Sequence, residues 1–374
     1  MQQGARVKRF ALLLAAAGCG YETPAPPRPP EPVPVQVLPC KGERSQVKGA
    51  WTLELLGAIP AGGLDRVVYR RGTTWQVGVV KDIPHTPKNV FDFDKPWDVQ
   101  VDLDGTVYLR GLWYGNPDQA NNVGDGLYRL DGSRATPLVD PTTLLPGSTE
   151  HFNSAGGFSV DHGWVAFWGG RPYEVSGVYA WHDGHVLTIA DSRGQVRGTG
   201  TPSVHAGQIA FQGEEQGVRG VYLWSEATGT KRVLKSAGPI FGNVALADHV
   251  LYAGAYDPRR VIAWSAGTEW IAAQPEWFKG SVGDAPMLDV DPVVRGDDLV
   301  VHVAQEKRNE LWNVSGCTLE RIAGTGDAVG TTTIAGVYNV RDTATLPDGD
   351  LVFLVVLADG SHHLVRAHRT LLAT

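Results

Sequence analysis

The spacing best suited to metal binding in this chain is that of His182 and His185, which flank Asp183-Gly184. Two imidazoles three residues apart can ligate a transition metal. Asp-Gly is equally the dipeptide that two-residue β-hairpin turns favour, and Asp131-Gly132 stands at the corresponding place of a similar segment. We therefore interpret residues 182–185 as a solvent-exposed turn and expect no metal site there.

Aspartates recur at a second turn. Asp102-Leu103-Asp104-Gly105 resembles half of a calcium-binding loop but lacks the later ligands and the terminal Glu. Asp297-Asp298 and Asp348-Gly349-Asp350 occupy the same place in other segments, and aspartates at such places usually form turns. The sequence also lacks the Gly-x-Ser-x-Gly, His-Glu-x-x-His, Cys-x-x-Cys and P-loop motifs. We expect neither a metal nor a cofactor, and we identify no catalytic residue.

Three long connections combine aromatic residues with carboxylates: Asp82–Trp97, Asp140–Gly157 and Ala273–Asp291. Loops of this length exceed what joining two strands requires, and long loops in compact domains often carry function. The candidate ligand-binding residues are Asp92, Asp94, Trp97, His151, Trp277 and Asp284. Such side chains suit a sugar, a peptide or a cation. The alternative is that the aromatic rings only hold the loops against the domain.

The N-terminus has the features of an export signal. A basic start with Arg6, Lys8 and Arg9 precedes the apolar stretch Phe10–Ala17, which is too short to span a bilayer. Ala16-Ala17-Gly18-Cys19 resembles the bacterial lipoprotein cleavage box, although Ala16 stands where Leu is usual. We expect residues 1–18 to be a signal peptide and Cys19 to carry lipid that holds the chain on a membrane. The alternative is an ordinary secretory signal that contains a cysteine.

Residues 19–44 form a proline-rich linker before the globular part, residues 45–374. The prolines between Tyr21 and Pro39 favour an extended polyproline spacer. These features predict an exported protein of the cell envelope, at the outer membrane and facing either the periplasm or the surface. Loss of the three basic residues of the signal takes the formal net charge from −7 to −10. The chain has no basic stripe, so we expect no nucleic-acid partner.

Cys40 and Cys317 remain if Cys19 is lipidated. In an oxidising compartment two cysteines either pair or stay as isolated thiols, and the sequence leaves both options open. In the chain-entropy model, a bridge closing so long a loop would contribute about 4–5 kcal/mol.

These residues must be positioned by a repeated β unit, which recurs every 40–50 residues or so. Its pattern is an apolar strand, a turn, a second apolar strand, a variable loop and a third strand with aromatic residues. Three copies show it most clearly: Val160–Phe167 with Gly177–Gly184, Val204–Phe211 with Gly220–Trp224, and Val101–Tyr108 with Gly126–Gly132. Strand-only repeats of this size are typical of propeller blades.

We count seven copies with four strands each, which predicts an all-β fold: a single closed β-propeller of seven four-stranded blades. Six blades follow instead if the first copy, Gly49–Leu55 with Val67–Gly72, is an irregular lead-in. We expect Ser45–Lys48 to supply the first strand and Arg369–Ala373 the last, without exchange between the chain ends. Tyr128, Tyr179 and Tyr222 should be equivalent third-strand residues buried between blades.

Two copies resemble a family of bacterial exported tandem-repeat proteins with an Asn-x-x-Gly-x-x-Ala-Phe motif. The resemblance lies in His162-Gly163-Trp164-Val165-Ala166-Phe167 and Ala206-Gly207-Gln208-Ile209-Ala210-Phe211. Asp161 and His205 stand where the motif has Asn. The resemblance implies an exported propeller and brings no reaction and no functional residues.

The reading we favour is a membrane-tethered envelope lipoprotein whose propeller binds a protein or carbohydrate partner at the face bearing the long loops, without catalysis. The first alternative is a propeller enzyme, such as a hydrolase, a lyase or a quinoprotein, with its site at the mouth of the channel. The second alternative is a purely structural component of the envelope.

Overall fold

The computed structural model describes residues 39–49, 51–58, 66–71, 74–79, 99–102, 104–114, 123–131, 134–171, 174–235, 241–279, 281, 285–306, 308–338, 343–345 and 349–369. Contacts divide the chain into two units, Met1–Val35 and Gln36–Thr374, and all described residues belong to the second. Among them, no helix is long and apolar enough to cross a membrane. Nearly every element is a β-strand, and the described part has one short 3-10 helix, η2 (Pro275–Phe278).

Tight two-residue turns explain why strands follow one another so closely. In His162-Gly163 both residues have positive φ, 48° and 78°, and Asp183-Gly184 repeats this with 48° and 81°. Two positive φ angles define a type I′ turn, whose twist matches that of the flanking strands, and glycine adopts this backbone without strain. The prediction that residues 182–185 form a turn is therefore confirmed.

The strands of the described residues form seven sheets. Three of the four-stranded sheets follow one another in the chain: β9 (Ser154–Asp161), β10 (Trp164–Arg171), β11 (Val175–His182) and β12 (His185–Asp191); β13 (Val196–His205), β14 (Gln208–Glu215), β15 (Val218–Ser225) and β16 (Gly229–Lys235); β17 (Phe241–Leu246), β18 (Leu251–Tyr256), β19 (Arg259–Ser265) and β20 (Thr268–Ala273). A fourth precedes them, with β5 (Val99–Val101), β6 (Val107–Tyr114), β7 (Val123–Asp131) and β8 (Arg134–Val139).

Two larger sheets and a hairpin complete the described set. One sheet contains β1 (Ser45–Lys48), β21 (Met287–Leu288), β22 (Val293–Arg295), β23 (Asp298–Gln305), β24 (Arg308–Ser315) and β25 (Thr318–Gly324). The other, here called the closing blade, contains β2 (Trp51–Ala58), β26 (Ala328–Val329), β27 (Thr332–Val337), β28 (Thr343–Thr345), β29 (Leu351–Leu357) and β30 (His362–Arg369). The hairpin consists of β3 (Arg66–Arg71) and β4 (Thr74–Val79).

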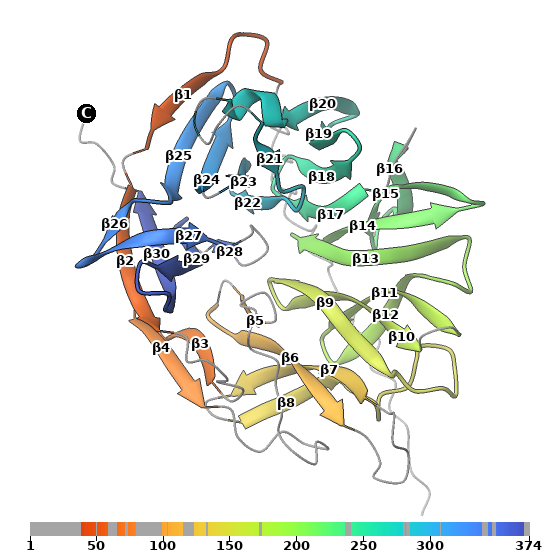
Figure 1. Cartoon of the computed structure of the whole chain (residues 1–374). Helices are drawn as coiled ribbons and strands as arrows, with labels where there is room; N and C mark the ends of the chain where they lie inside the picture. Colours follow the sequence, from red (N-terminus) through yellow and green to blue (C-terminus); the bar gives the residue numbers. More distant parts are fainter. Residues whose placement is uncertain are drawn as a thin grey trace, which may run out of the picture. The chain divides into compact units, whose positions relative to one another are not determined.

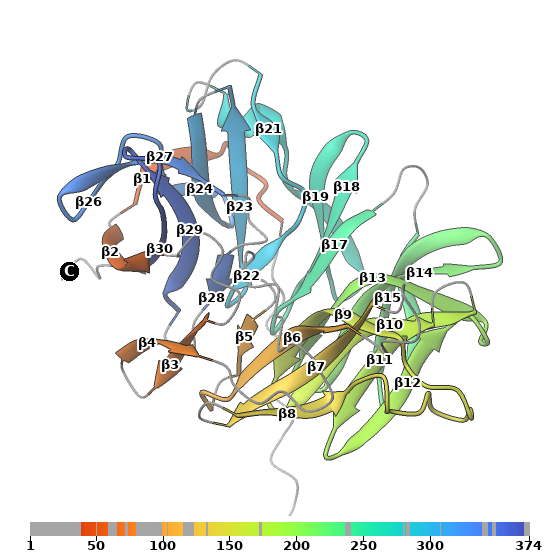
Figure 2. The ribbon, with the colours of Figure 1, turned by 60° about the horizontal axis from the view of Figure 1, so that its bottom comes forward.

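The sheets stand in a ring, which is the β-propeller that the repeats predict (Figure 1). The strands nearest the common centre contact one another in the order β3, β5, β9, β13, β17, β22 and β28. Two views place the β3–β4 hairpin between β2 and β5 (Figures 1 and 2). The described residues thus give six full blades. The first repeat copy contributes only this hairpin to the described residues. The six-bladed alternative that the sequence left open therefore describes these residues better than the seven-bladed one.

The closing blade corrects one sequence expectation. β2 does not belong to the first blade but pairs antiparallel with β30, with Leu53 opposite Ala367. β2 therefore forms the outer edge of the C-terminal blade and links the two ends of the propeller. Our prediction that Arg369–Ala373 would supply this outer strand was wrong, because β2 occupies the place beside β30.

The segment before β2 runs along a different blade. β1 pairs parallel with β25, from Ser45 opposite Thr318 to Lys48 opposite Arg321. This contradicts the expectation that Ser45–Lys48 is the first strand of the first blade. A disulfide joins Cys40 to Cys317, with a Cα–Cα distance of 5.0 Å and a sequence separation of 277. The structure thus fastens the start of the propeller to the turn between β24 and β25.

The antiparallel order within each blade defines two faces. The turns from first to second strand and from third to fourth strand lie on one face, which we call the turn face. The turns from second to third strand and the connections between blades lie on the other, which we call the loop-bearing face. Two of the long connections predicted to bind a partner, from β8 to β9 and from β20 to β21, therefore begin and end on the loop-bearing face.

Side chains packed between neighbouring blades form the core. Tyr128, Tyr179 and Tyr222 are at most 1% exposed, and each lies opposite an apolar residue of the second strand: Leu109, Phe167 and Phe211. The register with the fourth strand shifts immediately before each tyrosine, so the same β-bulge recurs in these blades. The predicted equivalence and burial of the three tyrosines are confirmed.

Candidate functional site

Five of the residues singled out from the sequence lie outside the described part of the chain: Cys19, Asp92, Asp94, Trp97 and Asp284. The connection Asp82–Trp97 lies outside it as a whole. Two candidate ligand-binding residues, His151 and Trp277, can be placed.

Trp277 belongs to η2 at the start of the connection from β20 to β21. This helix inserts between two blades: Phe278 is fully buried, and Trp277 packs against the same apolar cluster. The guanidinium carbon of Arg44 lies 3.5 Å from the centre of the Trp277 ring, and Gln46 donates a hydrogen bond to the Trp277 carbonyl (2.8 Å). The Trp277 ring therefore holds the N-terminal segment by a cation–π contact, which is the packing role that we kept as the alternative.

His151 is exposed and lies on the loop-bearing face. Its backbone forms a β-bridge with Leu144, whose side chain is 51% exposed. Leu145 and Phe152 of the same connection are buried and anchor it to the core. The centre of the Phe152 ring lies 5.0 Å from that of the Tyr179 ring. The buried pair fixes the loop, and Leu144 and His151 are presented to solvent.

A second exposed apolar group on this face was not predicted. Tyr256, at the end of β18, is 39% exposed, and Met287, at the start of β21, is 56% exposed. Arg259 links them: it lies opposite Tyr256 in the β18–β19 pair and donates a hydrogen bond to the Leu288 carbonyl (3.2 Å). We call Leu144, Tyr256 and Met287 the apolar residues of the loop-bearing face. The sequence pattern could not predict that these residues are exposed, because isolated apolar residues at strand ends also occur in cores.

Ion pairs also lie on the loop-bearing face. Arg171 binds both Glu150 and Glu174, the latter at 3.0 Å. Arg193 donates to Asp191 from Nε (2.8 Å) and to the Pro146 carbonyl (3.0 Å), and the Asp191 side chain is only 3% exposed. Hydrogen bonds with Asp191 raise the pKa of Arg193, whereas burial raises the pKa of Tyr179 beside the same carboxylate. These contacts hold the loops of this face in place.

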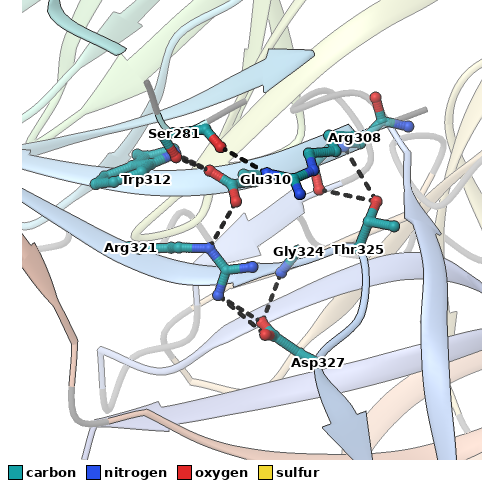
Figure 3. A network of polar contacts seen from close by, with 9 residues as sticks. Ser281, Arg308, Glu310, Trp312, Arg321, Gly324, Thr325 and Asp327 are labelled. Atoms are coloured by element: carbon teal, nitrogen blue, oxygen red, sulfur yellow. Dashed lines mark hydrogen bonds and ion pairs between the residues drawn. The ribbon is translucent and has the colours of Figure 1, made fainter. Parts of the chain in front are cut away.

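A second network of ion pairs and hydrogen bonds connects β24, β25 and the turn that follows β25 (Figure 3). Glu310 accepts hydrogen bonds from Ser281, from the Trp312 indole (3.1 Å) and from Arg321 Nε (2.8 Å). Arg321 also reaches Asp327 at 2.8 Å, and the Gly324 amide donates to the same carboxylate. Burial alone lowers the pKa of Arg321, but hydrogen bonds with Glu310 and Asp327 raise it overall. The guanidinium stays charged between two carboxylates, which stabilises the turn.

The turn face carries a set of histidines and aspartates that the sequence did not predict as a site. The Asp102 carboxylate accepts the backbone amides of His162 (2.8 Å) and Gly163 (2.6 Å) in the next blade. Asp161 pairs with His162 Nδ1 at 2.9 Å and accepts the Ala206 amide of the blade after that. These aspartates therefore join the turns of neighbouring blades.

The set continues across the next two blades. His205 Nε2 lies 2.6 Å from Asp248, and His249 Nδ1 lies 2.7 Å from Asp297. Ligand atoms of Asp248, His249 and Asp297 all lie within 4.8 Å of one another. A hydrogen bond with Asp297 raises the pKa of His249, and one with Asp161 raises that of His162.

The sequence predicts that Asp102, Asp104 and Asp297 are turn formers. Asp104 fits that role, since it accepts the Thr106 amide of its own turn (2.7 Å). His182 has a packing role, because its ring stacks on that of Trp164 with a distance of 4.0 Å between the ring centres. The signal that could have revealed the rest is the recurrence of His or Asp at one turn in successive copies: Asp161-His162, His205 and Asp248-His249.

No protein-family model matches this chain, and no curated protein does. Solved structures with a similar fold include an oligogalacturonate lyase in complex with manganese, at 11% identity and a TM-score of 0.46, covering 86% of this chain and 98% of that one. TolB from Acinetobacter baumannii has 10% identity and a TM-score of 0.41, covering 73% of this chain and 66% of that one.

A putative TolB from Agrobacterium tumefaciens is also similar, with 12% identity and a TM-score of 0.42 over 79% of this chain and 95% of that one. These similarities are similarities of fold alone. The chain is a β-propeller, and its function has to be argued from its own residues.

Proposed function

We propose that this chain is an exported, membrane-tethered propeller that binds a partner protein through its loop-bearing face and does not catalyse a reaction. The observation that carries the binding part is the exposure of Tyr256 and Met287 beside Arg259 on that face. Three further arguments support the proposal.

The first argument concerns the compartment. A disulfide between Cys40 and Cys317 suits an oxidising environment outside the cytoplasm. The basic start, the short apolar stretch and Cys19 suit export followed by lipidation. Lipid on Cys19 and the proline-rich linker together would hold the propeller at a distance from a membrane.

The second argument concerns the chemistry of the surface. Tyrosine, methionine and arginine are enriched in protein–protein interfaces, where an apolar centre is surrounded by a polar rim. Leu144, Tyr256 and Met287 supply apolar area on this face, and the Arg171 pairs with Glu150 and Glu174 supply polar groups on the same face. An apolar centre with charged groups on the same face suits docking of a protein.

The third argument favours a protein over a carbohydrate. Sugar rings stack on open aromatic faces beside carboxylates. The Trp277 ring is covered by Arg44, and buried Asp191 is occupied by Arg193. The large apolar side chains that we find exposed on this face are Leu144, Tyr256 and Met287, a set that matches an apolar protein surface.

Photo-cross-linking in intact cells tests the proposal. A photoreactive residue is placed at position 256 or at position 287, and in a control at Asp183, whose side chain is 86% exposed on the turn face. We expect one discrete adduct from positions 256 and 287 and none from position 183. Adducts of equal yield from both faces, or no adduct from the loop-bearing face, would exclude this docking surface.

A further inference from the structure

We propose that the turn face holds a divalent transition-metal site, with Asp248, His249 and Asp297 as ligands and zinc as the best-suited ion. The proposal does not depend on the function assigned to the loop-bearing face, because the two sites lie on opposite faces. It rests on the side chains that two successive blades bring together.

The ligand set is the first argument. One imidazole nitrogen and two carboxylate oxygens lie within 4.8 Å of one another, although Asp248 and Asp297 are 49 positions apart in the sequence. Nitrogen and oxygen ligands of this kind bind zinc at about 2.0–2.2 Å. Ligand atoms in a tetrahedral site are then about 3.3 Å apart, so small side-chain rotations would close the present group around an ion.

The charges are the second argument. In the described part of the chain, the ion-pair partners of Asp248 and Asp297 are the imidazoles of His205 and His249, not an arginine or a lysine. Elsewhere in the molecule a guanidinium neutralises neighbouring carboxylates, as Arg321 does for Glu310 and Asp327. A dication would supply the charge that the turn-face group lacks.

The support around the ligands is the third argument. The His249 carbonyl accepts a hydrogen bond from Ser265 (2.6 Å), and the Asp297 carbonyl accepts one from Tyr252 (2.7 Å). Ser265 and Tyr252 are both buried. The Asp297 carboxylate also accepts the His249 amide at 2.9 Å, so the two ligand-bearing turns are fixed relative to each other. Metal sites depend on such support, because it holds the ligands in position before the ion binds.

His205 is the nearest candidate for a fourth ligand. Its Nε2 lies 2.6 Å from Asp248, and its side chain is 26% exposed. With His205 included, the ion would connect the β13–β16, β17–β20 and β21–β25 blades. The site would then tie together three successive blades on the turn face, where the blades are otherwise joined by hydrogen bonds between turns.

The test measures metal binding directly on the purified full-length chain without a histidine tag. Zinc is titrated calorimetrically, and cobalt is added in parallel because its visible absorption reports tetrahedral nitrogen and oxygen ligation. We expect one equivalent of zinc and a cobalt spectrum that zinc displaces. Asp297→Asn and His249→Ala should each weaken binding by about tenfold or more, in line with the loss of an ordered ligand.

Two further variants keep the test decisive. Asp248→Asn changes a side chain that is 60% exposed, so it should fold normally and still weaken binding. His162→Ala is the matched control, since His162 is also a turn-face histidine paired with an aspartate but lies in another blade. It should bind zinc like the unchanged chain. The proposal fails if the unchanged chain binds no zinc, if the three ligand variants bind it normally, or if His162→Ala weakens binding equally.

Discussion

At the scale of single residues, the tyrosine of the third strand is the main packing group between blades. Tyr179 is fully buried, lies 5.8 Å from the Phe167 ring and 5.0 Å from the Phe152 ring, and touches a neighbouring blade and a connecting loop. Aromatic pairs of this kind contribute both apolar area and specific ring geometry. The stability of the ring should therefore depend strongly on this position.

Replacing Tyr179 with Ala is expected to lower the free energy of unfolding by about 3 kcal/mol or more, as for other large aromatic residues in cores. Tyr256→Ala is the matched control, because the Tyr256 side chain is partly exposed, and it should cost about 1 kcal/mol or less. Urea denaturation of both variants measures the difference. Equal losses would mean that burial between blades does not set the cost.

His302 makes stability depend on pH. Its side chain, at the interface between β23 and the closing blade, is 9% exposed, and its Nε2 has no hydrogen-bond partner among the described residues. Burial lowers the pKa of His302 from 6.5 to about 4, only partly offset by a backbone hydrogen bond with Val337. Between these two values the unfolded chain binds the proton and the folded chain does not. Stability is therefore complete above about pH 6.5 and falls as the pH drops towards 4.

The expected loss from this residue is about 3 kcal/mol between pH 7 and pH 4. Urea denaturation of the unchanged chain and of His302→Leu at both values isolates it, because the other titrating groups are common to both. The variant should lose less stability on acidification by about that amount. Parallel pH profiles would show that His302 is protonated equally in both states.

At the scale of elements, the repeats could be predicted because each blade has the same order of strands and turns, and the alternation of apolar residues marks each strand locally. The blade to which β2 belongs could not be predicted from the sequence. Leu53 and Leu55 would face a core equally well in the first blade or in the last, and only ring closure selects β30 as the partner of β2. The turn-face histidines and aspartates were missed for a similar reason. Their spacing is that of ordinary turns, and only the stacking of blades brings Asp248 to His205 and Asp297 to His249.

Pairing of β2 with β30 should be required for a stable ring. A chain that starts at residue 59 loses β1 and β2, exposes the edge of β30 and removes Trp51, Leu53 and Leu55 from the core of the closing blade. We expect it to aggregate or to melt without a cooperative transition. A chain that starts at residue 39 keeps both strands and is the control.

Circular dichroism melting of the two truncated chains, exported behind the same substitute signal, makes the comparison. A cooperative transition of the shorter chain at the temperature of the control would contradict a structural role for β2.

At the scale of the whole molecule, we propose a lipid anchor, a proline-rich spacer and a propeller that faces a partner. Cys19→Ser should release the protein from membranes into the soluble fraction, because without lipid the short apolar stretch Phe10–Ala17 cannot anchor it. Fractionation of cells that express either form, with immunodetection of the propeller, measures this. A variant that remains fully in the membrane fraction would exclude Cys19 as the anchor.

The central claim is that the loop-bearing face docks a protein, and the most direct measurement is the size of the complex in gently solubilised membranes. Native electrophoresis compares the unchanged chain with Tyr256→Ser combined with Met287→Ser, whose melting temperature is checked first. Both side chains are substantially exposed, so the fold should survive. We predict that the unchanged chain migrates in a larger complex and that the double variant migrates alone. A complex that persists in the double variant, or an unchanged chain that migrates alone, would contradict the account.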